Sequence, residues 1–224
     1  MTMPALHILG RAIAVAALAA MLAGCNLVYS EKPLFTKADS VGAAPFKPGL
    51  WARVDKGCEV DVTKPVAQWP ECAGAMVITP TSLIDPAKPG ESADYVLVAG
   101  DPPILQAPYK NDAGLTLYFY IGIKPLALDS KGRMVGFESW ISQCGPPPPK
   151  SDKPISDKTP MSEFVTKEPI PGLIPNSKTG MCKAIAQDPV RASAKASRAW
   201  SDEIKPVKWV ADAPPPAAAA PPSP

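Results

Sequence analysis

The side chains best suited to chemistry in this chain are its cysteines, of which there are five. Cys25 stands at the end of a long apolar run, directly after two small residues. The other four are spread through the rest of the chain, and no two of them form a Cys-x-x-Cys pair: Cys58, Cys72, Cys144 and Cys182. That spacing argues against a four-thiolate metal site and against a redox-active pair. An even number of cysteines in an exported protein instead predicts two structural disulfides.

Four cysteines allow three pairings, and the sequence favours one of them. Cys58 and Cys72 flank a short segment that can fold back locally. Cys144 and Cys182 bracket a proline-rich loop that a covalent bond would hold. Each bond is expected to contribute on the order of 3 to 4 kcal/mol, in the account that attributes disulfide stability to restriction of the unfolded chain.

The segment before Cys25 has the pattern of an export signal. Arg11 is its one fixed charge, and residues 12–22 contain no charged side chain. This apolar stretch is shorter than the roughly 20 residues needed to cross a bilayer core. The two small residues before Cys25 leave the backbone accessible to a peptidase. We therefore expect residues 1–24 to be a signal peptide that is removed.

The sequence Leu22-Ala23-Gly24-Cys25 resembles the lipobox of bacterial lipoproteins, and the resemblance covers residues 1–25 only. It implies attachment of diacylglycerol to the Cys25 sulfur, cleavage before Cys25, and acylation of the new amino group by a fatty acid such as palmitate. Two or three acyl chains at about 0.8 kcal/mol per buried CH₂ give a stable membrane anchor. The alternative is an ordinary secretory signal with a chance cysteine near its cleavage site.

The same resemblance implies a location. By the sorting rule of that family, Asn26 rather than aspartate after the lipidated cysteine favours the outer membrane. The implied protein is lipid-anchored in the cell envelope, held in the outer membrane through Cys25 and facing the periplasm.

Removal of the signal also removes the only histidine, His7. Histidine is the side chain whose charge changes near neutral pH, and it is the commonest metal ligand. Its loss excludes Ser-His-Asp and Cys-His catalysis and zinc sites that contain histidine. The 23 basic residues less Arg11 leave 22 against 21 acidic ones, a balance that indicates neither nucleic acid nor an anionic surface as partner. No cofactor and no metal are expected.

Composition divides the mature chain into three parts. Residues 25–48 mix charges with proline and glycine and are predicted to form a tether. Residues 49–211 are predicted to form a β-rich globular domain. Residues 212–224 are rich in proline and alanine and are predicted to be a disordered tail.

A hairpin is the clearest structural unit of the predicted domain. Residues 115–125 are apolar on both faces, the turn sequence Asp129-Ser130-Lys131-Gly132 follows, and residues 133–143 return. Further strands are predicted at residues 50–54, 75–79, 95–99 and 207–210. The predicted class is therefore mostly β, as a single curled antiparallel sheet or a small sandwich, stabilised by disulfides.

One helix near the C-terminus completes the predicted fold. Residues 190–200 are rich in alanine, arginine and lysine. Asp188 is placed to cap this helix and Pro189 to be its first residue.

The sequence indicates two kinds of candidate site on this predicted fold. The first is an apolar binding surface in the proline-stiffened segment 101–109, which we expect to be a loop, together with a nearby tryptophan. Its candidate residues are Pro103, Ile104, Leu105, Tyr109 and Trp140. Such a surface would take an apolar or sugar ligand or a partner strand. The alternative is that the aromatic residues only pack the core.

The second kind of site is catalytic and uses carboxylates. The candidates are Asp55, Glu59 and Asp61 at a strand end, and Glu138 in the hairpin. Glu138 is expected to face water or to pair with Arg133 or with a lysine near the sheet edge.

The expected function is a non-enzymatic structural, accessory or binding role in the envelope, with an envelope protein or the cell wall as partner. One alternative is a histidine-free hydrolase of envelope polymer that works through carboxylates. Another is a periplasmic inhibitor of an enzyme, which the sequence does not separate from the first role.

Overall fold

The computed structural model describes residues 26–55, 57–88, 90–111, 114–148, 165–201 and 204–212. The predicted signal peptide and the predicted lipidation site Cys25 lie outside these ranges. So do residues 213–224 of the predicted tail.

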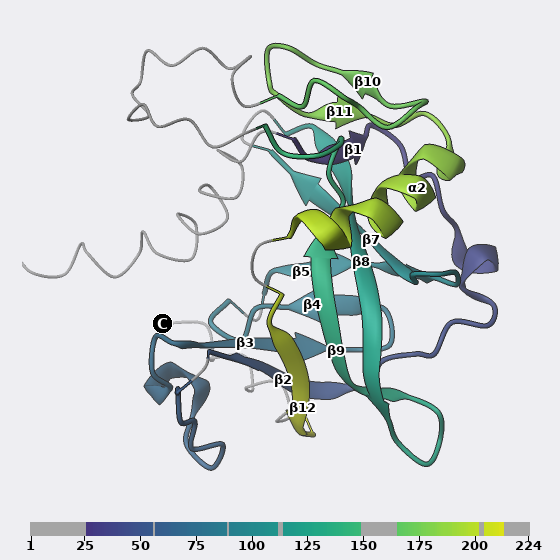
Figure 1. Cartoon of the computed structure of the whole chain (residues 1–224). Coiled ribbons are helices and arrows are strands. Elements are labelled where there is room, and N and C mark those ends of the chain that lie inside the picture. The colour runs from purple at the N-terminus through teal and green to yellow at the C-terminus, as the bar shows by residue number, and fades with distance from the viewer. Residues whose placement is uncertain are drawn as a thin grey trace, which may run out of the picture.

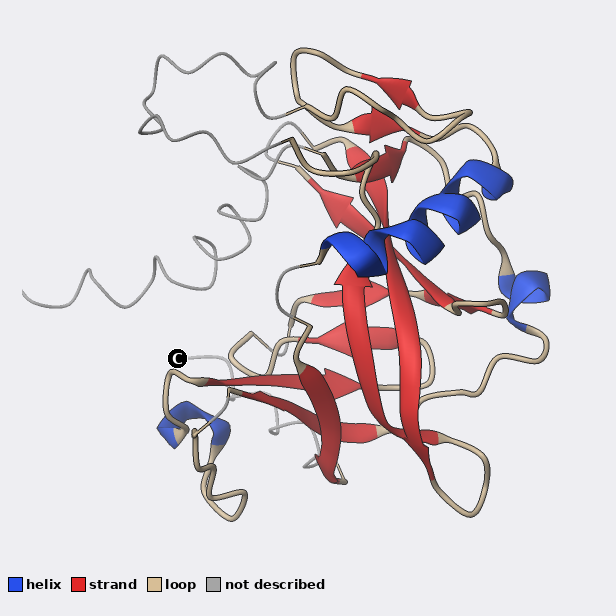
Figure 2. Cartoon of the chain, viewed as in Figure 1, coloured by secondary structure: helices blue, strands red, loops and turns tan. Residues whose placement is uncertain are grey.

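Strands dominate the described part of the chain, and they belong to one twelve-stranded sheet (Figure 2). All of the strand pairs are antiparallel except that of β1 with β11. This confirms the expected class. The strands are β1 (Val28–Ser30), β2 (Gly49–Val54), β3 (Ala73–Ile78), β4 (Ser82–Ile84), β5 (Ser92–Asp94), β6 (Val96–Val98), β7 (Ile104–Lys110), β8 (Thr116–Leu128), β9 (Met134–Ile141), β10 (Ile174–Pro175), β11 (Cys182–Lys183) and β12 (Pro206–Ala211).

The sheet curls back on itself around the long β8–β9 hairpin (Figure 1). From β9 it continues through β12, β2, β3 and β4 to β5, and from β8 it continues through β7 to β6. Only Tyr95 separates β5 from β6. The short segment 92–98 therefore pairs with β4 through β5 and with β7 through β6.

The β8–β9 hairpin forms where the sequence predicted it, because its turn residues satisfy one another. The Gly132 N–H donates to the Asp129 carbonyl at 3.0 Å, and Gly132 has the positive φ of +73° that glycine adopts without strain. The Asp129 carboxylate accepts hydrogen bonds from the Arg133 guanidinium at 2.8 and 2.7 Å. The turn thereby fixes which residues of the two strands face each other.

Two hydrophobic cores lie on opposite faces of the curled sheet. The inner core, inside the curl, is built from β2, β3, β6, β7, β8, β9 and β12 and includes Trp51, Leu97 and Leu105. The outer core lies on the other face, beneath the helix and β1 and β11, and includes Val98, Ile104 and Cys182. Because side chains alternate along a strand, neighbouring residues of β6 and β7 enter different cores.

The helix α2 (Gln187–Ser197) is the one α-helix of the described residues, and the 3₁₀ turn η5 (Arg198–Trp200) continues it. It lies across β8 and β9 (Figure 1) and buries Val190, Ser193, Ala194 and Ser197 at helical spacing. The predicted cap is wrong: the N-cap is Ala186, so Asp188 lies inside the first turn, where its charge favours the helix dipole. None of the helices in the described ranges is long and apolar enough to span a bilayer.

The predicted disulfides are both confirmed. Cys58 is bonded to Cys72 with 5.9 Å between the Cα atoms, and this bond closes the excursion between β2 and β3. Cys144 is bonded to Cys182 with a Cα separation of 5.5 Å. The second bond joins the end of β9 to β11 inside the outer core.

The prediction of a tether over residues 25–48 is wrong for its described part, because residues 26–48 belong to the folded body. Phe35 is 1% exposed in the outer core, and Phe46 is 2% exposed in the inner core. The buried Gln106 side chain accepts from the Leu34 and Phe35 N–H groups and donates to the Phe35 carbonyl. The charged residues and prolines of this segment suggested a solvated linker, but its widely spaced apolar side chains insert into the cores.

Candidate functional site

The structure does not bring the predicted binding residues together in one groove. Ile104 is fully buried in the outer core and Leu105 is 4% exposed in the inner core. The expectation of a loop over residues 101–109 is wrong, because β7 begins at Ile104. Pro108 is accommodated in this strand because β6 pairs only with residues 104–106, so β7 has a partner on one side only beyond them.

Trp140 is also buried, beneath α2. Its indole N–H donates to the Ala194 carbonyl of α2 at 2.7 Å, and 5% of the residue is exposed. Directly opposite it in the sheet lies Gly122, where any Cβ would overlap the indole ring. The glycine therefore provides the space in which the tryptophan packs beneath the helix.

The remaining two candidates lie on the body of the protein with local contacts. Pro103 is half-buried, and its carbonyl accepts from the Ile123 N–H at 2.9 Å. Tyr109 is half-buried and meets the Phe119 ring edge-on at 5.9 Å. The aromatic residues of this set thus pack against the protein itself, which was the alternative interpretation.

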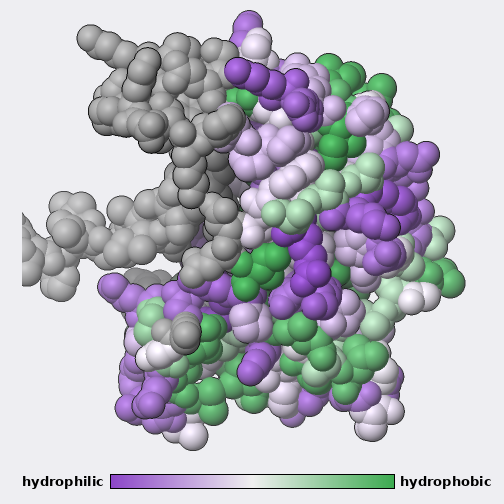
Figure 3. Space-filling view, in the orientation of Figure 1, coloured by the Kyte–Doolittle hydropathy of each residue, from purple (hydrophilic) through white to green (hydrophobic). Residues whose placement is uncertain are grey.

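Among the described residues, the large exposed apolar side chains are distributed over several segments of the chain. The large ones come from separate parts of the chain: Val41, Val62, Leu115, Leu126, Leu128, Ile174 and Ile185. On the face shown in Figure 3, apolar and polar residues are interspersed. Scattered exposed apolar residues are normal for a protein surface.

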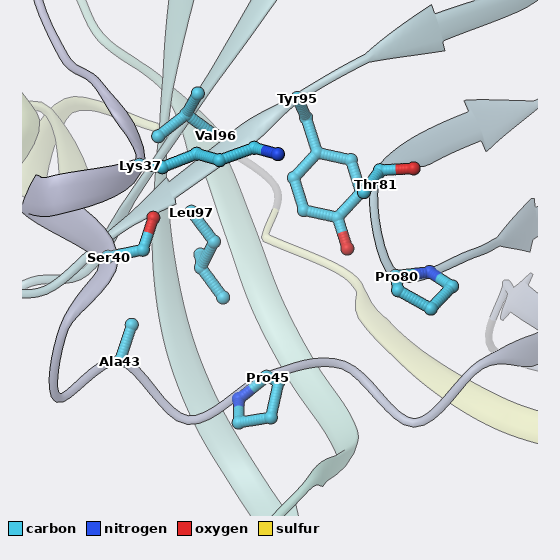
Figure 4. Close-up of a pocket in the computed structure, with 9 residues that line it drawn as sticks. All are labelled: Lys37, Ser40, Ala43, Pro45, Pro80, Thr81, Tyr95, Val96 and Leu97. Atoms are coloured by element: carbon cyan, nitrogen blue, oxygen red, sulfur yellow. The ribbon is translucent and has the colours of Figure 1, made fainter.

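A pocket of about 320 Å³ opens beside the curled end of the sheet (Figure 4). One wall is formed by η2 (Lys37–Ser40) and the chain that follows it, and the opposite wall by the turn between β3 and β4. The segment of β5 and β6 forms the base. The lining residues are Lys37, Ser40, Ala43, Pro45, Pro80, Thr81, Tyr95, Val96 and Leu97. This volume is at the small end of the range for ligand pockets, which starts at about 300 Å³.

Tyr95 is the most constrained polar residue of this pocket. Its hydroxyl donates to the Thr79 carbonyl at 2.9 Å, and its ring meets Phe46 edge-on at 5.7 Å. Burial raises the pKa of Tyr95 to about 12. The phenol therefore stays protonated at neutral pH, and its one proton is donated to the Thr79 carbonyl, which makes it unsuited to act as a base.

The other lining residues complete a largely apolar site with a polar rim. Figure 4 shows the Lys37 side chain extended toward Tyr95, with the Ser40 hydroxyl on the same wall. Leu97, Pro45 and Pro80 supply apolar surface, and the lining includes no carboxylate and no cysteine. Such a site can bind a small apolar group and offer an ammonium and a hydroxyl to a polar end of the ligand.

The candidate catalytic carboxylates near the end of β2 differ in their surroundings. Asp61 accepts from the Thr63 hydroxyl at 2.6 Å and from the Thr63 N–H at 3.0 Å, and these bonds lower the pKa of Asp61 below its ordinary value. A general acid needs the opposite shift. Asp55 lies 3.0 Å from the Lys205 ammonium, and Glu59 is exposed.

Glu138 is half-buried and pairs with two cations. Its carboxylate accepts from the Arg198 guanidinium at 2.9 Å and lies 3.7 Å from the Lys124 ammonium across the hairpin. Of the alternatives expected for Glu138, pairing with a lysine is the one observed, whereas Arg133 pairs with Asp129 instead. Within the described ranges, no three His, Cys, Asp or Glu side chains lie where they could hold a metal ion.

The residues of the pocket were not predicted from the sequence. Lys37, Ser40 and Ala43 lie in the segment that we predicted to be a tether, and Tyr95 was seen only as part of a strand. The spacing of Phe35 and Phe46 on either side of η2 was the one available signal, because two large apolar residues are unusual in a solvated linker.

Comparisons of the chain with protein-family models, with curated proteins and with solved structures find no match. Relatives therefore assign no role to the pocket. The residues that line it and the chemistry of the cysteines carry the argument for function.

Proposed function

We propose that this chain is a lipid-anchored protein of the bacterial cell envelope, and that its β-rich body has a binding role without catalysis. The distribution of the five cysteines is the observation that carries this proposal. Four of them form two disulfides, which persist in exported proteins and are rare in the cytosol. The fifth, Cys25, is the one that resembles a lipidated cysteine. In this proposal every cysteine of the mature protein has a chemical role.

The pocket beside Tyr95 supports the binding part of the proposal. Its surface is largely apolar, and its fixed phenol and its lysine suit recognition better than turnover. The partner we propose is an envelope protein or cell-wall component that presents a small apolar group to this pocket. The anchor places such a partner on the periplasmic side of the outer membrane, as the Asn26 position favours.

The anchor is tested by replacing the proposed lipidated residue. The Cys25→Ser variant is expected to lose incorporation of labelled palmitate and to run as an unprocessed precursor. The Ser177→Ala variant, changed in an exposed turn, is the control and is expected to keep both properties. Unchanged palmitate labelling and processing in the Cys25→Ser variant would contradict the anchor.

The binding site is tested by crosslinking in intact envelopes. A photo-reactive residue at Thr81, exposed on the rim of the pocket, is expected to give a defined adduct, whereas one at Lys131 in the hairpin turn is not. Ser40→Trp fills the pocket and should abolish the Thr81 adduct. Adducts that form equally from both positions, or that persist in the Ser40→Trp variant, argue against the pocket as the binding site.

The hydrolase alternative has its own measurement. Because the proposed role is not catalytic, turnover of peptidoglycan by the purified protein is expected at background level. The Asp61→Asn and Glu138→Gln variants are expected to show the same background level. Turnover that is present in the parent protein and lost in a folded variant would favour catalysis over binding.

A further inference from the structure

The first residue that the structure describes, Asn26, is held inside the folded body. Its N–H donates to the Gly180 carbonyl at 2.7 Å, and its carbonyl accepts from the Cys144 N–H at 2.6 Å. The side-chain Nδ2 donates to the Gly145 carbonyl at 2.8 Å. Only 4% of Asn26 is exposed. Backbone and side chain are thus both fixed, which is the opposite of a flexible linker.

The partners of Asn26 are fixed in turn. Cys144 is bonded covalently to Cys182. Two residues after Asn26, Val28 pairs with Cys182 in β11, and its N–H donates to the Ser142 carbonyl at 3.0 Å. The disulfide, β1 and the end of β9 therefore hold Asn26 in one orientation relative to the whole sheet.

Covalent geometry then limits the distance between this fixed residue and the proposed lipid. Successive Cα atoms are about 3.8 Å apart, so the residue that carries the proposed lipid is the immediate neighbour of this fixed position. We propose that the end of the molecule around Asn26 rests directly on the bilayer surface, with lipid headgroups as its partner, and that the β8–β9 hairpin points away from the membrane. This inference rests on the lipid anchor proposed above.

We call this part of the surface the anchor end and define it as Asn26, Gly145, Lys167 and residues 176–180. The turn 176–180 adjoins Asn26 through the Gly180 carbonyl, and it exposes Lys178. Residues 166–168 pack against Gly145 so closely that a Cβ there would overlap the Glu168 carbonyl. Lys167, in that segment, is also exposed. Two lysines therefore report on contact at the anchor end.

A third lysine reports on the far end of the molecule. Gln143, two residues before Gly145 of the anchor end, pairs with Leu27, and β9 leads from there back to Met134 beside the hairpin turn. The stretch from Met134 to Gln143, at about 3.4 Å per residue, spans roughly 30 Å. The turn of the β8–β9 hairpin lies at the opposite end of the molecule from β1 (Figure 1). Lys131 lies in this turn and is exposed, so it is expected to remain in water.

The experiment uses the full lipidated protein added to preformed vesicles of phosphatidylethanolamine and phosphatidylglycerol. An amine reagent that does not cross bilayers labels the lysines, and mass spectrometry measures the labelling of each one. The matched control carries a Gly/Ser linker of about 15 residues between Cys25 and Asn26, which reaches roughly 20 Å and frees the body from the surface. Flotation of the vesicles shows that both proteins are attached.

The expected result is that Lys167 and Lys178 label several-fold less in the parent protein than in the linker variant, while Lys131 labels equally in both. Equal labelling of all three lysines in two floating proteins would overturn the docked orientation and leave the anchor intact. Protection of Lys178 that persists in the linker variant would overturn it as well, because the contact would not depend on the anchor. Failure of the parent protein to float would overturn the anchor itself, and with it this inference.

Discussion

The two disulfides hold regions of opposite character. Cys58 and Cys72 are 14 residues apart and close an excursion at the surface, where Cys72 is exposed. Cys144 and Cys182 are 38 residues apart, and both are fully buried in the outer core. The first bond fastens a local loop, whereas the second fastens the N-terminal strand, the end of β9 and β11 to one another. Sequence spacing therefore predicts which cysteines pair, but burial decides what each pair stabilises.

Loss of the buried disulfide is expected to have the largest effect. The double variant Cys144→Ala/Cys182→Ala should lower the free energy of unfolding by about 4 kcal/mol from loop entropy alone. It should also increase amide hydrogen exchange at Asn26 and Val28, because β1 loses its fixed neighbour. Urea unfolding and exchange mass spectrometry measure the two effects. Unchanged exchange at the N-terminal strand would show that this bond does not hold the anchor end.

Loss of the surface disulfide provides the contrast. The double variant Cys58→Ala/Cys72→Ala should lower the free energy of unfolding by at most about 3 kcal/mol. Increased exchange should be confined to residues 57–72, since β2 and β3 remain paired on either side. Exchange that spreads to Asn26 in this variant would remove the distinction between the two regions.

Variants beneath α2 test whether the stability of the outer core depends on more than its disulfide. Gly122→Ala places a Cβ in the Trp140 ring and should cost about 1 to 3 kcal/mol by overpacking. Gly136→Ala is the matched control in the neighbouring strand, because its Cβ would have no atom nearer than 3.7 Å. Thermal and urea unfolding of the two variants measure the difference. Equal stability of the two would contradict the tight contact between Gly122 and Trp140.

The hairpin turn, which neither disulfide holds, is expected to show the smallest effect. Hydrogen bonds from Arg133 lower the pKa of Asp129 from 3.8 to about 2. A lowered folded-state pKa stabilises the fold above the ordinary value, and this contribution disappears as the pH falls from about 4 through 2. The stability difference between the parent protein and Asp129→Asn should therefore shrink over that range. Unfolding curves at several pH values test this, and a constant difference would contradict it. The effect is small because solvent screens a surface pair.

Much of the local structure could be predicted because it depends on neighbouring residues. Asp129, Gly132 and Arg133 form their turn within five consecutive positions, so the sequence alone indicates the hairpin. The local pairing of Cys58 with Cys72 follows from the same logic. The helix was predicted in the right place, but it begins at Gln187 and its cap is Ala186. The Gln187 side chain donates to the Leu34 carbonyl, a contact with a distant segment that local sequence does not reveal.

The errors fall where distant segments meet. The composition of residues 26–48 predicted a linker. The Gln106 side chain, however, accepts hydrogen bonds from the Leu34 and Phe35 N–H groups across about 70 positions of the chain. The prolines around Ile104 suggested a loop, yet that residue starts a strand between β6 and β8. The pocket was missed for the same reason, since its walls come from segments that the sequence keeps far apart.

The sequence by itself determined the features that need only local chemistry: the even set of cysteines after Cys25, the turn residues of the hairpin and the β-rich class. The export signal before Cys25 stays a prediction. Tertiary structure alone decided which face each strand buries, that residues 26–48 belong to the folded body, and that Lys37 and Tyr95 line one pocket. The physical reason is that burial and hydrogen bonding between distant segments form only when the sheet curls. Composition averages over single residues such as Phe35 and Phe46, and it is these residues that join the segments together.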